Sequence, residues 1–99
     1  MAKNGMRPVH PGEVLREDFL VPGNLSANAL AKALNVPAPH INDIVRERRD
    51  VSADTAMRLA LYFGGDARSW LNLQAAYDLR VAEIENAKRI EHEIVPLAA

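Results

Sequence analysis

Apolar residues recur along most of the chain every three to four positions, which is the spacing of one face of an α-helix. This pattern predicts five helices, over residues 11–21, 27–34, 38–47, 53–63 and 67–95. In the first four helices the residues expected to face the core are Val14, Leu15, Phe19, Leu20, Leu30, Ala31, Leu34, Ile41, Ile44, Val45, Ala56, Leu59, Ala60 and Phe63. No segment alternates as a strand does, so the sequence predicts an all-α fold.

Residues at the ends of these segments support the same boundaries. Ser26, Ser52 and Asp66 are suited to begin helices, because their side-chain oxygens can accept a backbone N–H of the first turn. Asn35 is expected to close the second helix in the left-handed conformation, which Asn tolerates nearly as well as Gly. Gly64-Gly65 ends the fourth helix.

The chain is expected to form one domain. Its 99 residues are near the usual size of a domain, and no linker or internal repeat divides them. Gly5 and Pro8 disfavour a helix near the start. Residues 1–9 are therefore predicted to be a flexible lead-in, and residues 10–95 a single domain.

The segment over about residues 26–47 has the spacing of a helix-turn-helix, with a turn of about three residues between two short helices. Ala31 is small enough for the helices to approach closely, Asn35 takes the turn position and Val36 packs between them. In DNA-binding domains of this kind the second helix enters the major groove. A simple αα-corner in a small helical domain would have the same local spacing, so this alternative stays open.

Charge is unevenly divided along the chain, although the formal net charge is only −1. A near-neutral total speaks mildly against nucleic-acid binding, for which a basic surface is usual. Residues 1–49, however, hold seven basic and five acidic residues, whereas residues 50–99 hold five and eight. The basic excess accompanies the helix-turn-helix, and the acidic excess suits a basic protein partner.

Four stretches carry a family resemblance: Arg7–Leu20 with its His-Pro-Gly-Glu-Val-Leu segment, Ser26–Pro37, Ile41–Arg49 and Val51–Gln74. With these stretches the chain resembles the HigA-type antitoxins, a plasmid-maintenance antidote family of the Xre/Cro superfamily. The resemblance implies a five-helix, lambda-repressor-like domain with an extended C-terminal helix. It also implies a homodimer that binds operator DNA and represses its own operon. The implied protein partner is HigB, a RelE-like mRNA-cleaving toxin that the antitoxin neutralises.

The second helix of the helix-turn-helix carries the candidate base-reading residues, which are Ala38, His40, Asn42, Asp43 and Arg46. Asn pairs with adenine and Arg with guanine, and Ala38 can contact a thymine methyl group. Two alternatives stay open. Asp43 either reads a base or serves only the helix surface, by solvation or by pairing with Arg46. His40 either reads a base or covers the start of the helix.

Contacts to DNA phosphates are expected from Ser26, Lys32, Arg46, Arg48, Arg49 and Ser52. Three arginines within four positions form the densest basic patch in the chain, and the start of a helix can hold a phosphate. Ala27 stands where many superfamily members have a Gln that holds the phosphate backbone. The alternative for the arginines is a solvated loop that Glu47 and Asp50 partly neutralise.

The last helix is predicted to carry a dimer or toxin surface, formed by Trp70, Tyr77, Ile84, Ala87, Ile90 and Ile94. Its apolar line continues beyond what a compact five-helix core can cover, and charged residues flank it. An uncovered stripe of this kind usually marks a partner surface. One alternative is that the outer part of the helix folds back over the first helix, and another is that Trp70 packs in the core.

Enzymatic and metal-binding motifs are absent from the sequence. The three histidines lie in separate segments without metal-ligand spacing, and the lack of cysteine excludes disulfides, thiolate zinc sites and a Cys nucleophile. We therefore expect no catalytic activity, no cofactor and no metal. No apolar run is long enough to span a bilayer, so we expect a cytoplasmic protein without membrane contact.

The leading hypothesis is a dimeric antitoxin and autorepressor. Its operator should be an inverted repeat with half-sites about one helical turn, or roughly 34–36 Å, apart. One alternative is a toxin-binding helical module with little DNA binding, which the apolar Ala38-Pro39 start and the near-neutral charge motivate. Another is a solitary Xre-family regulator. A gene for a RelE-like protein directly upstream would favour the antitoxin over the solitary regulator.

Overall fold

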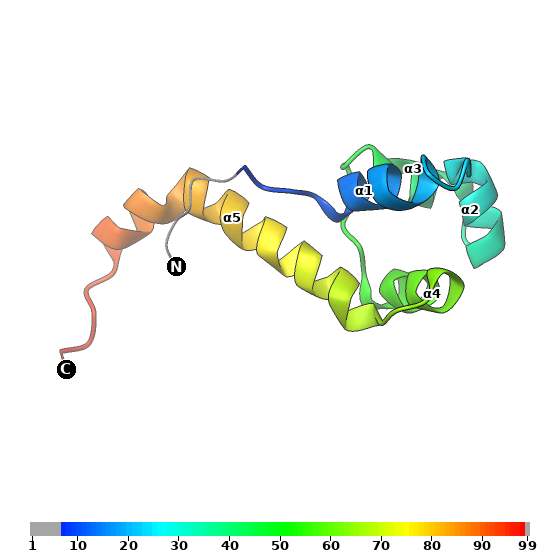
Figure 1. Ribbon diagram of the computed structural model, residues 1–99. Coiled ribbons are helices and arrows are strands. Elements are labelled where there is room, and N and C mark those ends of the chain that lie inside the picture. Colours follow the sequence, from blue (N-terminus) through cyan, green and yellow to red (C-terminus); the bar gives the residue numbers. More distant parts are fainter. Residues whose placement is uncertain (1–6, 99) are drawn as a thin grey trace.

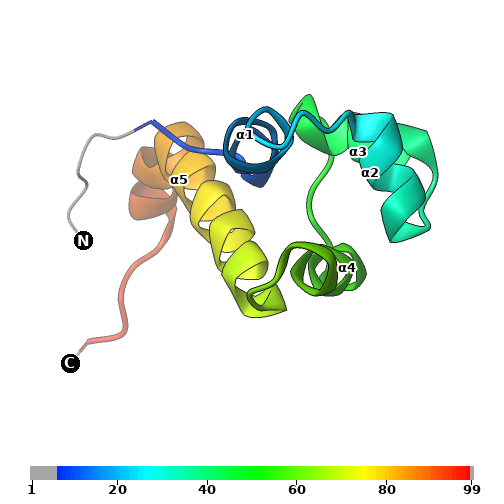
Figure 2. The same ribbon diagram turned by 45° about the vertical axis from the view of Figure 1, so that its right-hand side comes forward.

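The computed structural model describes residues 7–98, within which every regular element is a helix (Figures 1 and 2). The elements are α1 (Pro11–Val14), η1 (Leu15–Leu20), α2 (Ala27–Leu34), α3 (Ala38–Val45), α4 (Ala53–Phe63) and α5 (Ala67–Glu93). Because α1 and η1 form one continuous helix, the predicted all-α class with five helices is confirmed. The predicted domain limits, 10–95, stay a prediction.

The first helix was predicted to be α-helical over residues 11–21, but its second half is π-helical. In η1 the N–H of Val21 donates to the carbonyl oxygen of Arg16, five residues earlier, at 3.0 Å. A π-helical turn brings residues five apart to the same side of the helix. Leu15 and Leu20 therefore lie toward the same side, and both are buried.

The first helix lies directly against the end of α3. His10 begins the helix, and its Nδ1 accepts a hydrogen bond from the N–H of Gly12 at 2.8 Å. A Cβ atom on Gly12 would overlap the carbonyl oxygen of Ile44. This backbone contact between α1 and α3 requires glycine at position 12.

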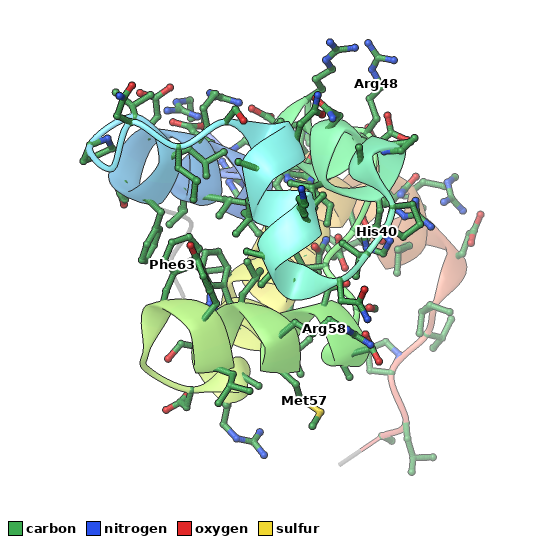
Figure 3. The ribbon with its side chains drawn as sticks, turned by 90° about the vertical axis from the view of Figure 1, so that its right-hand side faces the viewer. His40, Arg48, Met57, Arg58 and Phe63 are labelled. Atoms are coloured by element: carbon green, nitrogen blue, oxygen red, sulfur yellow. The ribbon has the colours of Figure 1, made fainter. Side chains whose placement is uncertain are left out.

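One apolar core joins the first four helices to the start of α5. Its buried members are Leu15, Leu20, Leu30, Ala31, Leu34, Ile41, Ile44, Val51, Ala56, Leu59 and Trp70. Phe19 closes one side, with its ring centroid 4.7 Å from that of Phe63 and 5.5 Å from that of Trp70. Figure 3 shows Phe63 pointing from α4 toward the first helix. Most residues predicted to face inward are buried. Five of the predicted residues are half-buried, namely Val14, Phe19, Val45, Ala60 and Phe63.

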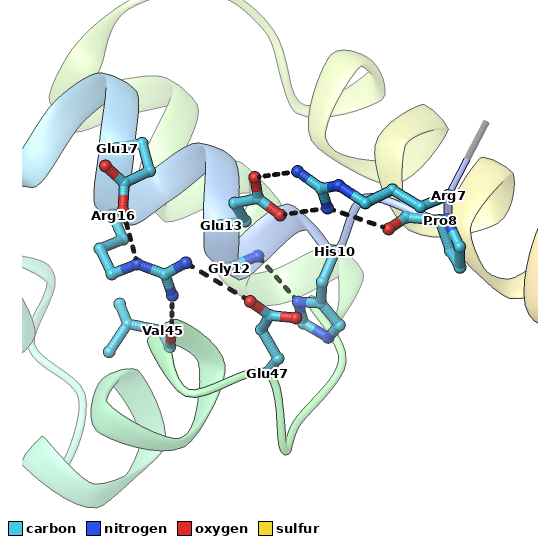
Figure 4. A network of polar contacts seen from close by, with 9 residues as sticks. All are labelled: Arg7, Pro8, His10, Gly12, Glu13, Arg16, Glu17, Val45 and Glu47. Carbon is cyan, nitrogen blue, oxygen red and sulfur yellow. Dashed lines mark hydrogen bonds and ion pairs between the residues drawn. The ribbon is translucent and has the colours of Figure 1, made fainter.

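The predicted flexible lead-in is described only from residue 7, and residues 1–6 lie outside the described residues. Arg7 forms a two-pronged ion pair with Glu13, at 2.9 and 2.8 Å (Figure 4). The hydrogen bond from Arg7 lowers the pKa of the Glu13 carboxyl. Part of the predicted lead-in is thus attached to the first helix.

The last helix extends well beyond the core (Figure 1). Its 27 residues correspond to about 40 Å of helix, and the described molecule measures 53 Å along one axis and 22 Å along the others. It ends at Glu93, two residues before the predicted end. The helix predicted over residues 38–47 also ends two residues early, because Glu47 adopts the left-handed conformation with φ 64°.

Candidate nucleic-acid interface

Two short helices, α2 and α3, meet across a tight turn. Ser26 begins α2, and its Oγ accepts an N–H of the first turn at 3.0 Å. Asn35 closes α2 in the left-handed conformation, with φ 60° and ψ 45°, as the sequence predicts. The N–H of Val36 donates to the carbonyl oxygen of Ala31 at 3.0 Å. Ala31 is 1% exposed, so the two helices pack at close range.

The outer face of α3 is polar and lies beside α2. Ala38, Asn42 and Asp43 are half-buried there, whereas Arg46 is exposed at the end of the helix. The Nδ2 of Asn42 donates to the Ala38 carbonyl oxygen at 2.9 Å and to the Oδ1 of Asn28 at 2.8 Å. Asp43 and Arg46 do not form the ion pair that was one alternative. Their part in base reading stays a prediction.

A basic patch, formed by Arg46, Arg48 and Arg49, occupies the end of α3 and the loop after it. All three side chains are exposed, and Figure 3 shows Arg48 pointing away from the body. The neighbouring acids are engaged elsewhere: Glu47 accepts from Arg16 at 3.5 Å, and Asp50 accepts from Gln74 at 3.1 Å. Within residues 7–98 no acidic side chain pairs with the basic patch. The structure thus lacks the ion pairs with Glu47 and Asp50 that this alternative included, but it leaves the arginines solvated, so their contact with DNA stays a prediction.

The remaining predicted phosphate contacts differ in whether their hydrogen-bond donors are free. Ser26 and Lys32 are exposed, and Ser26 uses only its oxygen to cap α2. The Ser52 hydroxyl accepts the N–H of Thr55 at 3.2 Å and donates to the Thr55 Oγ1 at 3.3 Å. Ser26 and Lys32 can thus offer a donor to a phosphate, whereas the hydroxyl hydrogen of Ser52 is already engaged.

His40 lies at the contact between α3 and α4 (Figure 3), with its Nε2 2.9 Å from the Thr55 Oγ1. Burial lowers the pKa of His40, and the positive charge of Arg49 lowers it further, although Asp54 acts in the opposite direction. The neutral imidazole is therefore favoured near neutral pH. This placement agrees with the alternative that His40 covers the start of the helix, and its role in base reading stays a prediction.

A polar network centred on Arg16 ties the first helix to the end of α3 (Figure 4). Arg16 donates to the Val45 carbonyl oxygen at 2.5 Å, to Glu17 at 2.9 Å and to Glu47 at 3.5 Å. Val45 is the last residue of α3, so its carbonyl has no partner within the helix. A positive charge is also favourable at this end of a helix. Arg16 thereby holds the backbone at the end of α3 in place, directly before Arg46 of the basic patch.

The loop that follows the basic patch is held by Gln74 of α5. Its buried Oε1 accepts the N–H of Val51 at 2.7 Å, and its Nε2 donates to Asp50 at 3.1 Å and to Asp78 at 3.0 Å. The sequence reasoning missed this residue, as it missed Asn28 and Arg16. A polar side chain on a long helix normally faces solvent, and no local pattern shows that it meets a backbone group 23 residues earlier.

Two residues predicted for the partner surface lie near the core instead. Trp70 is 5% exposed and packs among the core residues of its own chain. Tyr77 is half-buried, with its ring centroid 4.8 Å from that of His10. The assignment of Trp70 to a partner surface is therefore corrected, because its side chain is already covered.

Of the other members of the predicted surface, Ile84, Ala87 and Ile90 lie farther along α5, and Ile94 directly follows its last residue. Ile84, Ile90 and Ile94 are 58%, 46% and 60% exposed, and Ala87 is half-buried. The alternative of folding back over the first helix is thus not seen for the three isoleucines. They expose apolar atoms beyond the core, and their part in binding a partner stays a prediction.

These features together define a helix-turn-helix domain with a long C-terminal helix. A family model described as "Helix-turn-helix" matches residues 15–70. Virulence-associated protein I of Dichelobacter nodosus is 58% identical over 96 residues, which cover 97% of this chain and 87% of that protein.

Two solved structures are similar over most of the chain. One is the Pseudomonas aeruginosa antitoxin HigA with the higBA promoter, which has a TM-score of 0.90 and 55% identity, and the match covers 93% of this chain and all of that one. The other is a Pseudomonas aeruginosa protein in complex with its 18-bp operator DNA, with a TM-score of 0.89 and 57% identity. This match covers 96% of this chain and all of that one. The chain belongs to the HigA-type antitoxins of the helix-turn-helix family.

The family resemblance and the predicted fold with an extended last helix are thereby confirmed. Other relatives are named as transcriptional regulators and as an antitoxin. Among the described residues no three His, Asp or Glu side chains gather as a metal site would require. None of the described helices has the length and apolar character needed to cross a membrane.

Proposed function

We propose that this chain is an antitoxin that binds the operator of its own operon as a homodimer and represses transcription. It further neutralises a RelE-like, mRNA-cleaving toxin of the HigB type. Residues 10–95 act as the single functional domain. The operator is an inverted repeat, and each protomer places α3 in one major groove, with half-sites about one helical turn apart.

The observation that carries the DNA-binding part is the unpaired basic patch at the end of α3. Within residues 7–98 its arginines have no acidic partner, because the two acids beside them are engaged by Arg16 and Gln74. Phosphate neutralisation releases counterions, and it supplies much of the affinity of DNA-binding proteins. Ser26 at the start of α2 and Lys32 within it add donors. The relatives include proteins solved with operator or promoter DNA.

The protein-binding part is supported by the far half of α5. The exposed Ile84 and Ile90, and Ile94 just beyond its last residue, offer apolar surface for a partner. Residues 50–99, which include α5, also carry the acidic excess, and this negative charge attracts a basic toxin. The homodimer and the toxin are therefore expected to use α5, on a surface separate from the basic patch.

The DNA-binding part is tested by measuring affinity for the chain's own promoter at several salt concentrations. Arg49→Ala should weaken binding to every sequence and reduce the slope of log affinity against log salt by about one. Arg68→Ala is the matched control, because Arg68 is exposed near the start of α5, away from the basic patch. An effect of Arg49→Ala at one base position only, or no specific binding by the unchanged protein at low salt, would overturn this part.

The toxin-binding part is tested by co-purification with a RelE-like protein encoded beside this gene. A triple variant with Arg46, Arg48 and Arg49 changed to alanine should keep the toxin bound while losing the operator. Failure of the unchanged chain to retain the toxin would leave a solitary regulator. Full neutralisation without any operator binding by the unchanged chain would instead indicate a toxin-binding module.

A further inference from the structure

A pair of asparagines, Asn28 of α2 and Asn42 of α3, joins the two helices of the helix-turn-helix at their outer edge. Both hydrogens of the Asn42 amide are engaged, one by the Ala38 carbonyl oxygen at 2.9 Å and one by the Asn28 Oδ1 at 2.8 Å. A carbonyl oxygen can only accept, so the Asn42 atom that faces Ala38 must be its Nδ2. The backbone of α3 thereby sets the orientation of the Asn42 amide.

This orientation changes what Asn42 can read in a major groove. An asparagine that pairs with adenine in the usual way donates to N7 and accepts from the N6 amino group with the same amide. Asn42 has no hydrogen left to donate, so only its Oδ1 is available. Asn28 is in the complementary state, because its Oδ1 is used and its two Nδ2 hydrogens are free.

The surroundings of the pair indicate that it serves the surface and not the core. Asn28 is exposed, and it lines a shallow groove between α2 and the start of α3 together with Lys32 and Ala38. The packing of α2 on α3 is provided by buried apolar residues, among them Ala31 and Ile41. Loss of the Asn28 side chain should therefore leave the fold in place.

We propose that Asn28 is a positioning residue for sequence specificity, which holds Asn42 as a hydrogen-bond acceptor only. In this state Asn42 selects an exocyclic amino group, the N6 of adenine or the N4 of cytosine, and makes no use of adenine N7. The free Nδ2 of Asn28 donates to a DNA phosphate beside Lys32. The inference rests on the proposed function, because Asn42 meets a base edge only if α3 enters a major groove.

The test uses operator duplexes that lack single base atoms, at the position where Asn42→Ala relaxes sequence choice. For an adenine, purine in its place removes the amino group, and 7-deazaadenine removes N7. Loss of the amino group should weaken binding by the unchanged protein about two- to tenfold, the size of one hydrogen bond. Loss of N7 should change affinity by less than about twofold. For a cytosine, 2-pyrimidinone removes the amino group and should have the same effect.

Two variants separate positioning from a merely structural role. Asn28→Asp keeps an acceptor for Asn42, so the requirement for the amino group should persist while affinity for all sequences falls, because a carboxylate repels phosphate. Asn28→Ala frees one hydrogen of Asn42. At an adenine position this variant should acquire a dependence on N7, and at a cytosine position it should lose part of its discrimination against thymine. Asn72→Ala, which changes an exposed residue of α5, is the matched control.

Several results would overturn the inference while leaving the proposed function standing. One is that the unchanged protein needs N7 and the amino group equally. Another is that it prefers guanine or thymine at the operator position that Asn42 reads. The third is that Asn28→Ala shows the same pattern of base dependence as the unchanged protein. In these cases the operator is still bound and Arg49→Ala still reduces the salt slope. Absence of operator binding by the unchanged protein would overturn both. Thermal unfolding of Asn28→Ala checks that the variant is folded.

Discussion

The two ends of the molecule use the same kinds of residue in opposite ways. In the body, formed by the first four helices and the start of α5, Ile44 is completely buried. In the outer half of α5, Ile90 is 46% exposed. Arginines show the same contrast: Arg16 caps the backbone at the end of α3, whereas Arg89 pairs only with side chains of its own helix.

This contrast indicates where folding energy and binding energy are located. Burial of an aliphatic side chain stabilises the fold only where other residues cover it. The body therefore holds most of the stability and the outer half of α5 contributes little, so that its apolar atoms stay available for a partner. Changes of matched residues in the two regions should have very different effects, and three such pairs follow.

The largest difference is expected between Ile44→Ala and Ile90→Ala. Truncation of the buried Ile44 should reduce the free energy of unfolding by about 2–5 kcal/mol, because it leaves a cavity. Truncation of Ile90 should change it by less than about 0.5 kcal/mol. Chemical denaturation at several fixed protein concentrations measures both values. A large loss for Ile90→Ala that is the same at all concentrations would contradict the contrast, whereas a concentration-dependent loss would indicate dimerisation through α5.

A smaller difference is expected between Arg16→Met and Arg89→Met, which keep most of the side-chain volume. Loss of the hydrogen bond to the Val45 carbonyl should cost about 1–2 kcal/mol, since hydrogen bonds from charged groups are the stronger ones. Arg89 makes an exposed i,i+4 pair with Glu93, and its loss should cost about 0–0.5 kcal/mol. Thermal unfolding monitored by circular dichroism compares the two. Equal losses would show that Arg16 does not stabilise the end of α3.

The smallest effect concerns pH. Because the pKa of His40 is lowered in the folded protein, the unfolded chain binds more protons as the pH falls from about 7 through the ordinary histidine range. The contribution of His40 to stability is thus present above this range and is lost as the pH falls through the pKa of the folded state.

The measurement is the free energy of unfolding of His40→Gln and of the unchanged chain between pH 7.5 and 5. The decline with falling pH should be shallower in His40→Gln. His92→Gln, near the exposed end of α5, should keep the slope of the unchanged chain. A parallel decline in all three proteins would show that titration of His40 is not coupled to folding.

Much of the fold could be predicted because its signals are local. Ser26, Ser52 and Asp66 begin their helices through their own side chains, and the left-handed Asn35 closes α2 at the predicted residue. The π-helical type of the first helix and the early end of α3 were not predicted, for reasons beyond local pattern. The apolar spacing of the first helix fits an α-helix and a π-helix about equally well, and nothing in the sequence marks Glu47 as left-handed.

The candidate site was predictable in outline but not in its connections. The dense arginines are visible in the sequence, but whether nearby acids neutralise them depends on Arg16 and Gln74, which approach from other helices. The state of Asn42 likewise depends on Asn28, which lies 14 residues earlier. Local periodicity predicts which face of a helix is polar, and only the tertiary fold decides which of those polar atoms are still free.

The buried Gln74 also limits how far α5 can be shortened without harm to the rest of the chain. The N–H of Val51 is buried and donates to Gln74. A protein that ends before Gln74 would therefore leave this N–H without an acceptor, beside the basic patch. A chain that ends soon after Asp78 keeps that acceptor and both carboxylates that orient it. The shortest chain that keeps the body intact would therefore retain the first three turns of α5. The part of α5 beyond these turns could be exchanged for another binding segment.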